Sequence, residues 1–192
     1  MILVDDSFST IVQGIETGRS IYANMQAFID FLISCNVGEV FAVFLATIGG
    51  FPSILSAQQL LWINLITDGP PATALGWNPT EKDIMRRPPR DRDENLINQW
   101  SLVRFAIIGL YIGIATVGIF ASNYIENGFT LDQISSWSSC SEWASDSSMC
   151  DAFTQPSLAL PQTLAMSELV TLELIKALCT VSLDNSIFEV GP

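Results

Sequence analysis

The chain has 192 residues, of which 49% are hydrophobic and 15% are charged. An average soluble domain carries about 25% charged residues, so this composition excludes a disordered chain and argues against an ordinary soluble domain. The 20 acidic residues outnumber the 8 basic ones, which argues against a nucleic-acid partner, because phosphate binding needs clustered Lys and Arg. The sequence has no histidine, which excludes imidazole catalysis and His-ligated metals.

Residues 1–26 are too polar for a signal peptide, since they contain Asp5, Asp6 and Glu16 and have no apolar run behind a basic start. Beyond them, four apolar stretches approach the ~20 residues with which a helix crosses ~30 Å of hydrocarbon. These predicted spans cover residues 27–48, 55–77, 102–124 and 161–183. We therefore expect an all-α membrane protein built as a four-helix transmembrane bundle.

The positions of the basic residues predict how this bundle is oriented. One lies before the first span and five lie between the second and third, namely Arg19, Lys82, Arg86, Arg87, Arg90 and Arg92. The loops after the first and third spans contain neither Lys nor Arg. By the positive-inside rule, loop 78–100 and both ends of the chain are cytosolic, and loop 122–162 faces the lumen or the exterior.

Two of the four cysteines, Cys140 and Cys150, lie in loop 122–162. In an oxidising compartment they can form a disulfide, and the alternative is a pair of free thiols. Cys35 and Cys179 lie within predicted spans, where the favoured interpretation is that they are small apolar packing residues.

Polar residues inside the spans indicate the function, since an ionisable side chain in hydrocarbon costs at least ~2.5 kcal/mol. Asn36 and Glu39 are three positions apart and share one helical face of the first span. Asn64, Thr67 and Asp68 share one face of the second span in the same way. Each group of polar residues is therefore expected to point toward one place in the bundle.

The second span is expected to break at Asp68-Gly69-Pro70-Pro71, because proline lacks the amide donor and clashes with the preceding helical turn. A broken helix frees backbone carbonyls beside Asp68, and such carbonyls can bind a cation.

Together with Glu173 in the fourth span, these residues predict a site for a hard cation. The candidate ligands are oxygen donors: Asn36, Glu39, Asn64, Thr67, Asp68 and Glu173. Ca²⁺ takes about 6 to 8 oxygen ligands and fits this set best among common ions. The alternative is that the polar groups hydrogen-bond the helices to one another, although three acids exceed what packing needs. Lys176, one turn after Glu173, can instead act as a counter-ion and remove Glu173 from the site.

Longer segments of the chain match one family closely. They are Asp5-Asp6, residues 8–12, Asn36-Val37-Gly38-Glu39, residues 61–69 and 71–76, Asp83-Ile84-Met85 and Arg87-Pro88-Pro89-Arg90. In these segments the chain resembles P-type Ca²⁺-ATPases of the sarco/endoplasmic-reticulum type. The resemblance implies the end of the phosphorylation domain and a cytosolic stalk at 1–20, the fifth to eighth transmembrane helices within 21–183, and a cytosolic tail at 184–192.

The resemblance also implies roles for individual residues. One Ca²⁺ site of the family matches Asn36, Glu39, Thr67, Asp68 and Glu173, and part of the second matches Asn64 with Asp68. Loop 122–162 matches a disulfide-bearing lumenal loop, with Cys140 and Cys150 at the matching positions. Sodium and proton pumps typically carry proline at the position of Gly38 and aspartate at that of Asn64, which favours Ca²⁺. Pro70 and Lys176 depart from the family pattern, which usually has leucine and an uncharged residue there.

By the same resemblance, a full-length pump uses ATP and Mg²⁺ to move Ca²⁺ from cytosol to lumen, with H⁺ counter-transport, in the endoplasmic or sarcoplasmic reticulum. The sequence contains no Asp-Lys-Thr-Gly-Thr phosphorylation motif. We therefore expect an inactive fragment or truncated gene model, whose partners are the lipid bilayer and the remaining domains and helices of the pump. The alternative is a non-catalytic membrane protein that packs against an intact pump and modulates it, and a passive channel is a weaker alternative.

Overall fold

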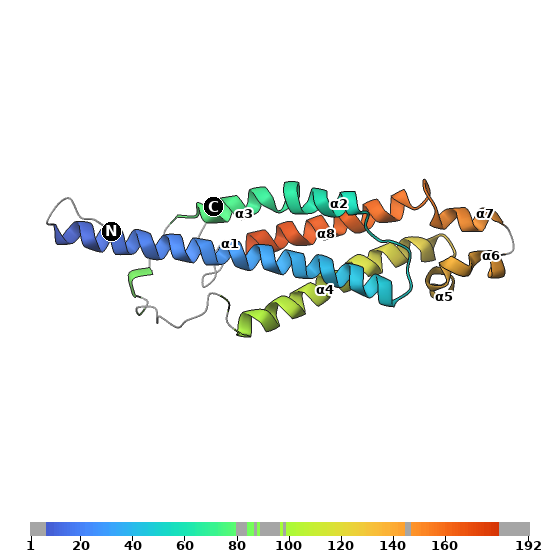
Figure 1. Ribbon diagram of the computed structural model, residues 1–192, viewed down its shortest axis with the longest axis horizontal. Helices are drawn as coiled ribbons and strands as arrows, with labels where there is room; N and C mark the ends of the chain where they lie inside the picture. Colours follow the sequence, from blue (N-terminus) through green and yellow to red (C-terminus); the bar gives the residue numbers. More distant parts are fainter. Residues whose placement is uncertain are drawn as a thin grey trace.

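The computed structural model describes residues 7–79, 84–86, 88, 97, 99–144 and 147–180. These residues form an elongated bundle of four helical rods and contain no strand (Figure 1). The first rod is α1 (Phe8–Ile48), the third is α4 (Gln99–Glu126) and the fourth is α8 (Ala159–Thr180). The second rod has three parts, which are α2 (Ala57–Trp62), η1 (Ile63–Thr67) and α3 (Gly69–Gly76). The prediction of an all-α four-helix bundle is confirmed.

The rods differ in how well each is suited to cross a membrane alone. By length and composition, α1 and α4 are long and apolar enough to do so. They contain the predicted spans 27–48 and 102–124, and α1 begins well before its span. The predicted span 55–77 corresponds to the divided second rod. The helix α8 contains span 161–183 as far as Thr180, and residues 181–192, which include the predicted tail, lie outside the described residues.

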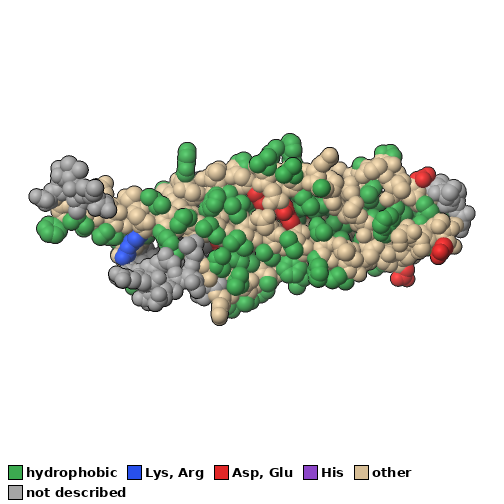
Figure 2. Space-filling model, in the orientation of Figure 1, with side chains coloured by type: hydrophobic (Ala, Val, Ile, Leu, Met, Phe, Trp, Pro, Cys, Tyr) green, Lys and Arg blue, Asp and Glu red, His purple; other side chains and the backbone are tan. Residues whose placement is uncertain are grey.

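The flanks of the rods are apolar and exposed, as Figure 2 shows for one face of the bundle. Exposed large side chains occur on all four rods, for example Phe44, Trp62, Ile107 and Leu178. A surface of this kind is unfavourable in water and is suited to contact with lipid chains.

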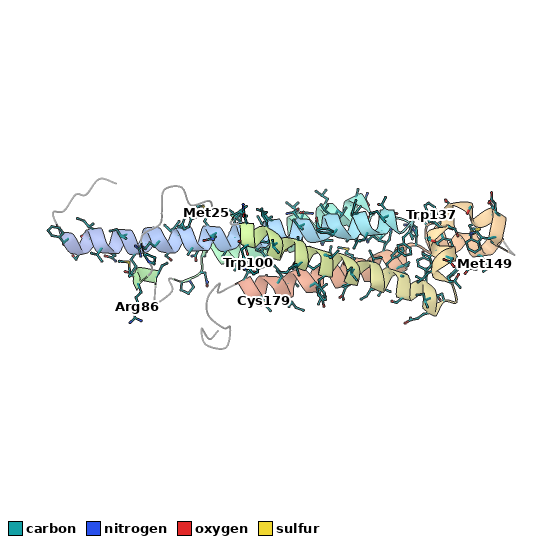
Figure 3. The ribbon with its side chains drawn as sticks, turned by 90° about the horizontal axis from the view of Figure 1, so that it is seen from below. Met25, Arg86, Trp100, Trp137, Met149 and Cys179 are labelled. Atoms are coloured by element: carbon teal, nitrogen blue, oxygen red, sulfur yellow. A yellow bond between two sulfur atoms is a disulfide. The ribbon has the colours of Figure 1, made fainter. Side chains whose placement is uncertain are left out.

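A cap of short helices closes one end of the bundle (Figure 1). It consists of α5 (Leu131–Ser135), η3 (Trp137–Ser139), α6 (Cys140–Trp143), α7 (Ser147–Cys150) and η4 (Asp151–Phe153). A disulfide joins Cys140 to Cys150 within this cap. The short helix η2 (Ile84–Arg86) lies toward the opposite end of the bundle, where Figure 3 labels Arg86.

The cap is tied to α4, and a separate hydrogen bond joins α8 to the connection between α1 and α2. The ring of Tyr124, near the end of α4, stacks on Phe153 with 5.2 Å between centroids, and its hydroxyl donates to the carbonyl of Ala152 at 2.9 Å. At the start of α8, the Gln162 side chain donates to the carbonyl of Ser53 at 2.8 Å, in the connection between α1 and α2. The first two contacts therefore fix the cap on α4, and the third holds the start of α8 against the connection that follows α1.

The helices α1 and α4 approach each other closely because glycines line their contact. A Cβ atom on Gly109 would lie 2.7 Å from Cγ1 of Val37, and one on Gly113 would lie 3.0 Å from the backbone nitrogen of Ala42. Small residues allow this kind of backbone approach between membrane helices. At the exposed Gly118, also on α4, an added Cβ atom would have no neighbouring atom within 4 Å.

Substitution of Gly109 by leucine is expected to destabilise the bundle by about 1–3 kcal/mol, because the larger side chain overpacks the contact between α1 and α4. The matched control is Gly118→Leu on the same helix, which should change stability by less than about 0.5 kcal/mol. Reversible unfolding of the purified protein in detergent measures both effects. Equal stabilities for the two variants would contradict the close-contact account.

Candidate metal centre

The second rod changes its winding just before Asp68. The segment η1 (Ile63–Thr67) is a π-helix, and α3 then begins at Gly69 with Pro70 and Pro71 in its first turn. Proline is tolerated at this position because the first amides of a helix have no acceptor within that helix. The predicted break is confirmed, and its form is a π-helical turn followed directly by a new α-helix.

The two prolines leave backbone oxygens without their usual helical donors. Residues 70 and 71 have no amide hydrogen, so the carbonyls of Ile66 and Thr67, four residues earlier, lose the α-helical bond that would reach them. The carbonyl of Asp68 itself accepts from the amide of Ala72 at 3.1 Å. Oxygen acceptors are therefore available immediately before the Asp68 side chain.

Asp68 and Glu173 form the centre of the candidate site. Each of these two residues is only 1% exposed. None of the four carboxylate oxygens accepts a hydrogen bond from another described residue, and the two carboxyl groups lie close enough to share a proton between them. Burial of an unpaired carboxylate costs several kcal/mol, so this pair of acids requires a cation or bound protons.

Cys35 is a third member of the cluster. Its sulfur, a carboxylate oxygen of Asp68 and a carboxylate oxygen of Glu173 all lie within 4.8 Å of one another. From the sequence alone, Cys35 is expected to be a packing residue, and this contact is not predicted. Spacing in the sequence could have indicated that Cys35 lies near the acids, because it is four positions before Glu39 and shares a helical face with it.

Glu39 on α1 lies beside this centre and is 6% exposed. The Nδ2 atom of Asn64 donates to both of its carboxylate oxygens, at 2.9 Å and 2.7 Å, and to the carbonyl of Leu60 at 3.0 Å. Glu39 also interacts electrostatically with Asp68 and Glu173, and both interactions are repulsive between charged groups. Of the three carboxylates, those of Glu39, Asp68 and Glu173, only that of Glu39 therefore accepts a hydrogen bond from another described residue, and the donor is Asn64.

The remaining predicted ligands are placed differently. Thr67 is half-buried on η1, directly before Asp68. Asn36 lies on an exposed part of α1, and its Nδ2 atom donates to the carbonyl of Leu32 in the same helix at 2.8 Å. The structure thus gathers Glu39, Asn64, Asp68 and Glu173, and it does not bring Asn36 into hydrogen-bond contact with them.

Lys176 lies one turn beyond Glu173 on α8 and is half-buried. It does not hydrogen-bond to Glu173, since neither oxygen of that carboxylate accepts a hydrogen bond from it. Its charge interacts instead with Asp30, Cys35 and Arg104. Asp30 on α1 is itself ion-paired with Arg104 on α4. Direct contact with Lys176 therefore does not remove Glu173 from the cluster.

Asn64→Ala is expected to lower the unfolding free energy by about 1.5–3 kcal/mol, because it leaves a buried Glu39 carboxylate without its donor. Asn36→Ala is the matched control, since that amide is exposed and bonds only to its own helix. It should cost less than about 0.5 kcal/mol. Chemical unfolding in detergent without added Ca²⁺ measures both, and an equal loss in the two variants would contradict the role given to Asn64.

The sequence of this chain is similar to those of known transport proteins. Residues 52–192 match the family model for the C-terminus of cation transporting ATPases. Over its whole length the chain is 44% identical to calcium-transporting ATPase 2, endoplasmic reticulum-type, of Arabidopsis thaliana, of which it covers 21%. It is 43% identical to calcium-transporting ATPase 4, endoplasmic reticulum-type, of the same plant, also covering 21%.

A relative from another lineage gives the same result. The chain is 42% identical to a calcium-transporting ATPase of Plasmodium falciparum, again over its whole length, and covers 17% of that protein. It thus spans about a fifth of the length of the curated relatives that it matches. The chain belongs to the family of cation-transporting ATPases and corresponds to the C-terminal membrane region of that family.

Proposed function

We propose that this chain is the membrane portion of an ATP-driven Ca²⁺ pump and that its buried acids hold Ca²⁺ during transport from cytosol to lumen. The observation that carries the proposal is the pair Asp68 and Glu173, whose four buried carboxylate oxygens accept no hydrogen bond from any other described residue. Phosphorylation by ATP and Mg²⁺ occurs on parts of the pump outside this sequence. The 42–44% identity to calcium-transporting ATPases supports the choice of ion.

The donor set fits a hard divalent cation. Glu39, Asn64, Thr67, Asp68 and Glu173 supply carboxylate, amide and hydroxyl oxygens from three of the four rods. Ca²⁺ accepts oxygen ligands of all three kinds in flexible geometries of high coordination number. Asn36 joins this set if its side chain leaves the carbonyl of Leu32, to which it now donates. Ca²⁺ binding also replaces the electrostatic repulsion among three acids with attraction.

The buried acids also account for proton movement in the opposite direction. When Ca²⁺ leaves toward the lumen, the carboxylates remain in a low-dielectric site and cannot stay charged without a partner. They therefore take up protons from the lumen and carry them back as the pump returns. The proposed cycle is Ca²⁺/H⁺ counter-transport.

The orientation follows from charge and compartment. The capped end, with its disulfide and exposed Asp132, Glu142 and Asp151, faces the lumen, where oxidising conditions maintain a disulfide. The end near Arg86 faces the cytosol, in accord with the positive-inside rule. Trp100 and Trp137 lie toward opposite ends of the four-rod part (Figure 3), as aromatic residues at the two membrane interfaces do. The proposed membrane is that of the endoplasmic reticulum, which appears in the names of the two plant relatives.

The alternative function, a non-catalytic protein that modulates an intact pump, has weaker support. A protein that only packs against another helix bundle can satisfy its polar side chains with one another. It has no need for two deeply buried acids that have no hydrogen-bond donor among the other described residues. The unpartnered acids therefore favour a transport site.

Asp68→Asn in the whole pump is expected to abolish Ca²⁺-dependent phosphorylation from ATP, because it removes the acid that both Ca²⁺ sites would share. The matched control is Glu126→Gln at the exposed end of α4, which should leave phosphorylation unchanged. The measurement is incorporation of labelled phosphate with and without Ca²⁺. If the Asp68 variant keeps its Ca²⁺ dependence, the assignment is wrong.

Counter-transport predicts that protons leave the lumen while Ca²⁺ enters it. The whole pump, reconstituted in vesicles with a trapped pH indicator, should raise the lumenal pH during ATP-driven Ca²⁺ uptake. A proton ionophore added with a potassium ionophore should abolish the pH change without stopping Ca²⁺ uptake. Uptake of Ca²⁺ at constant lumenal pH in tightly sealed vesicles would reject the proposed exchange.

A further inference from the structure

The thiol of Cys35 adds a ligand of a different chemical type to the acid cluster. Cys35 is fully buried on α1, and it is a free cysteine. Its sulfur lies within 4.8 Å of carboxylate oxygens from Asp68 on the second rod and Glu173 on α8. Three rods thus bring one sulfur and two carboxylates to a single point.

The two acids show that this point is built to hold a ligand. A lone buried thiol is adequately explained as a small apolar side chain. Here, however, it faces two carboxyl groups that are each only 1% exposed and that accept no hydrogen bond from any other described residue. The thiol therefore lies against two groups that themselves require a bound cation or protons.

Sulfur changes which cations the point can bind. Ca²⁺ is a hard cation with oxygen ligands, whereas the softer Zn²⁺ class of ions binds sulfur as thiolate, so that the metal displaces the thiol proton into solution. Zn²⁺ bonds to sulfur at about 2.3 Å and to carboxylate oxygen at about 2.0–2.2 Å. Two such ligand atoms on a tetrahedral ion lie about 3.6 Å apart, so modest side-chain rotations bring atoms now within 4.8 Å to bonding positions.

We propose that Cys35, Asp68 and Glu173 form a binding site for a thiophilic divalent cation of the Zn²⁺ class. Metal binding rests on these three groups alone. A second consequence, that such a cation and Ca²⁺ exclude each other, rests on the proposed function, because both ions would need the same two carboxylates. The proposed soft-metal site thus shares Asp68 and Glu173 with the proposed Ca²⁺ site.

Cd²⁺ is a suitable probe, because cadmium bound to thiolate gives a sulfur-to-metal charge-transfer band in the ultraviolet. The protein is titrated with Cd²⁺ alone, in a chelator-free and thiol-free buffer, and the band is followed to saturation. Wild type should show the band. Cys35→Ser should lose it and bind Cd²⁺ at least about tenfold more weakly, since metal sites lose 10–100-fold in affinity even when only a supporting group is removed.

Cys179→Ser is the matched control. Cys179 is the other free cysteine of the chain, and it is exposed toward the C-terminal end of α8 (Figure 3). This variant should keep both the band and the Cd²⁺ affinity of wild type. A band that disappears in Cys179→Ser and persists in Cys35→Ser would overturn the proposal, as would the absence of a band in wild type.

Two further measurements test this inference independently. They distinguish its failure from a variant that does not fold and from a failure of the proposed function. Glu173→Gln keeps the thiol and should also weaken Cd²⁺ binding, and an unchanged affinity in that variant would overturn the three-ligand site.

Added Ca²⁺ should displace Cd²⁺ from wild type and should still bind to Cys35→Ser, which shows that this variant is folded. Ca²⁺ that binds without displacing Cd²⁺ would overturn the shared site. A Cd²⁺ band that depends on Cys35 in a protein without Ca²⁺ binding would support the soft-metal site and refute only the Ca²⁺ function.

Discussion

A charged carboxylate without a hydrogen-bond donor is unstable inside an apolar bundle. Asp68 and Glu173 have no such donor among the other described residues, and both lie within reach of one sulfur atom. Their burial is possible only when a cation or protons balance the charge. This requirement links the fold to the proposed transport function, because each change of occupant changes the charge in the centre of the bundle. Glu39 increases the requirement, since its repulsion of Asp68 is relieved only in part by the amide of Asn64.

The bundle around these acids has a fixed part and a divided part. The helices α1 and α4 are held by glycine contacts and by the ion pair between Asp30 and Arg104. The cap is tied to α4, and the start of α8 is bonded to the connection after α1. The rod with Asp68 is divided instead into a short helix, a π-helical turn and a second helix that begins with two prolines. Such breaks concentrate conformational change in a few residues. In the proposed transport cycle, Asp68 is therefore the acid that this break would allow to move relative to the other two.

Hydropathy and spacing were sufficient to predict the rods, the break and the acids, because each follows from a local rule. A run of apolar residues favours a membrane helix, paired prolines remove two helical hydrogen bonds, and residues three or four positions apart share a face. Three features of the site could not be predicted in this way. The bond from Asn36 to Leu32 competes with any ligand role, the bond from Asn64 to Glu39 joins two rods, and the position of Cys35 depends on where three rods meet. The second and third depend on tertiary packing, which a single sequence does not specify, whereas the first is a side-chain conformation within one helix that spacing alone does not decide.

The central claim is that a cation binds between Asp68 and Glu173, and the most direct test is to locate the ion. Anomalous X-ray scattering from crystals of the whole protein grown with Ca²⁺ gives the position of the ion independently of any activity. The account predicts a peak in contact with carboxylate oxygens of Asp68 and Glu173, with Glu39 beside it. A structure whose Ca²⁺ peaks lie only on the exposed acids of the cap, with Asp68 and Glu173 in contact with no ion, would contradict it.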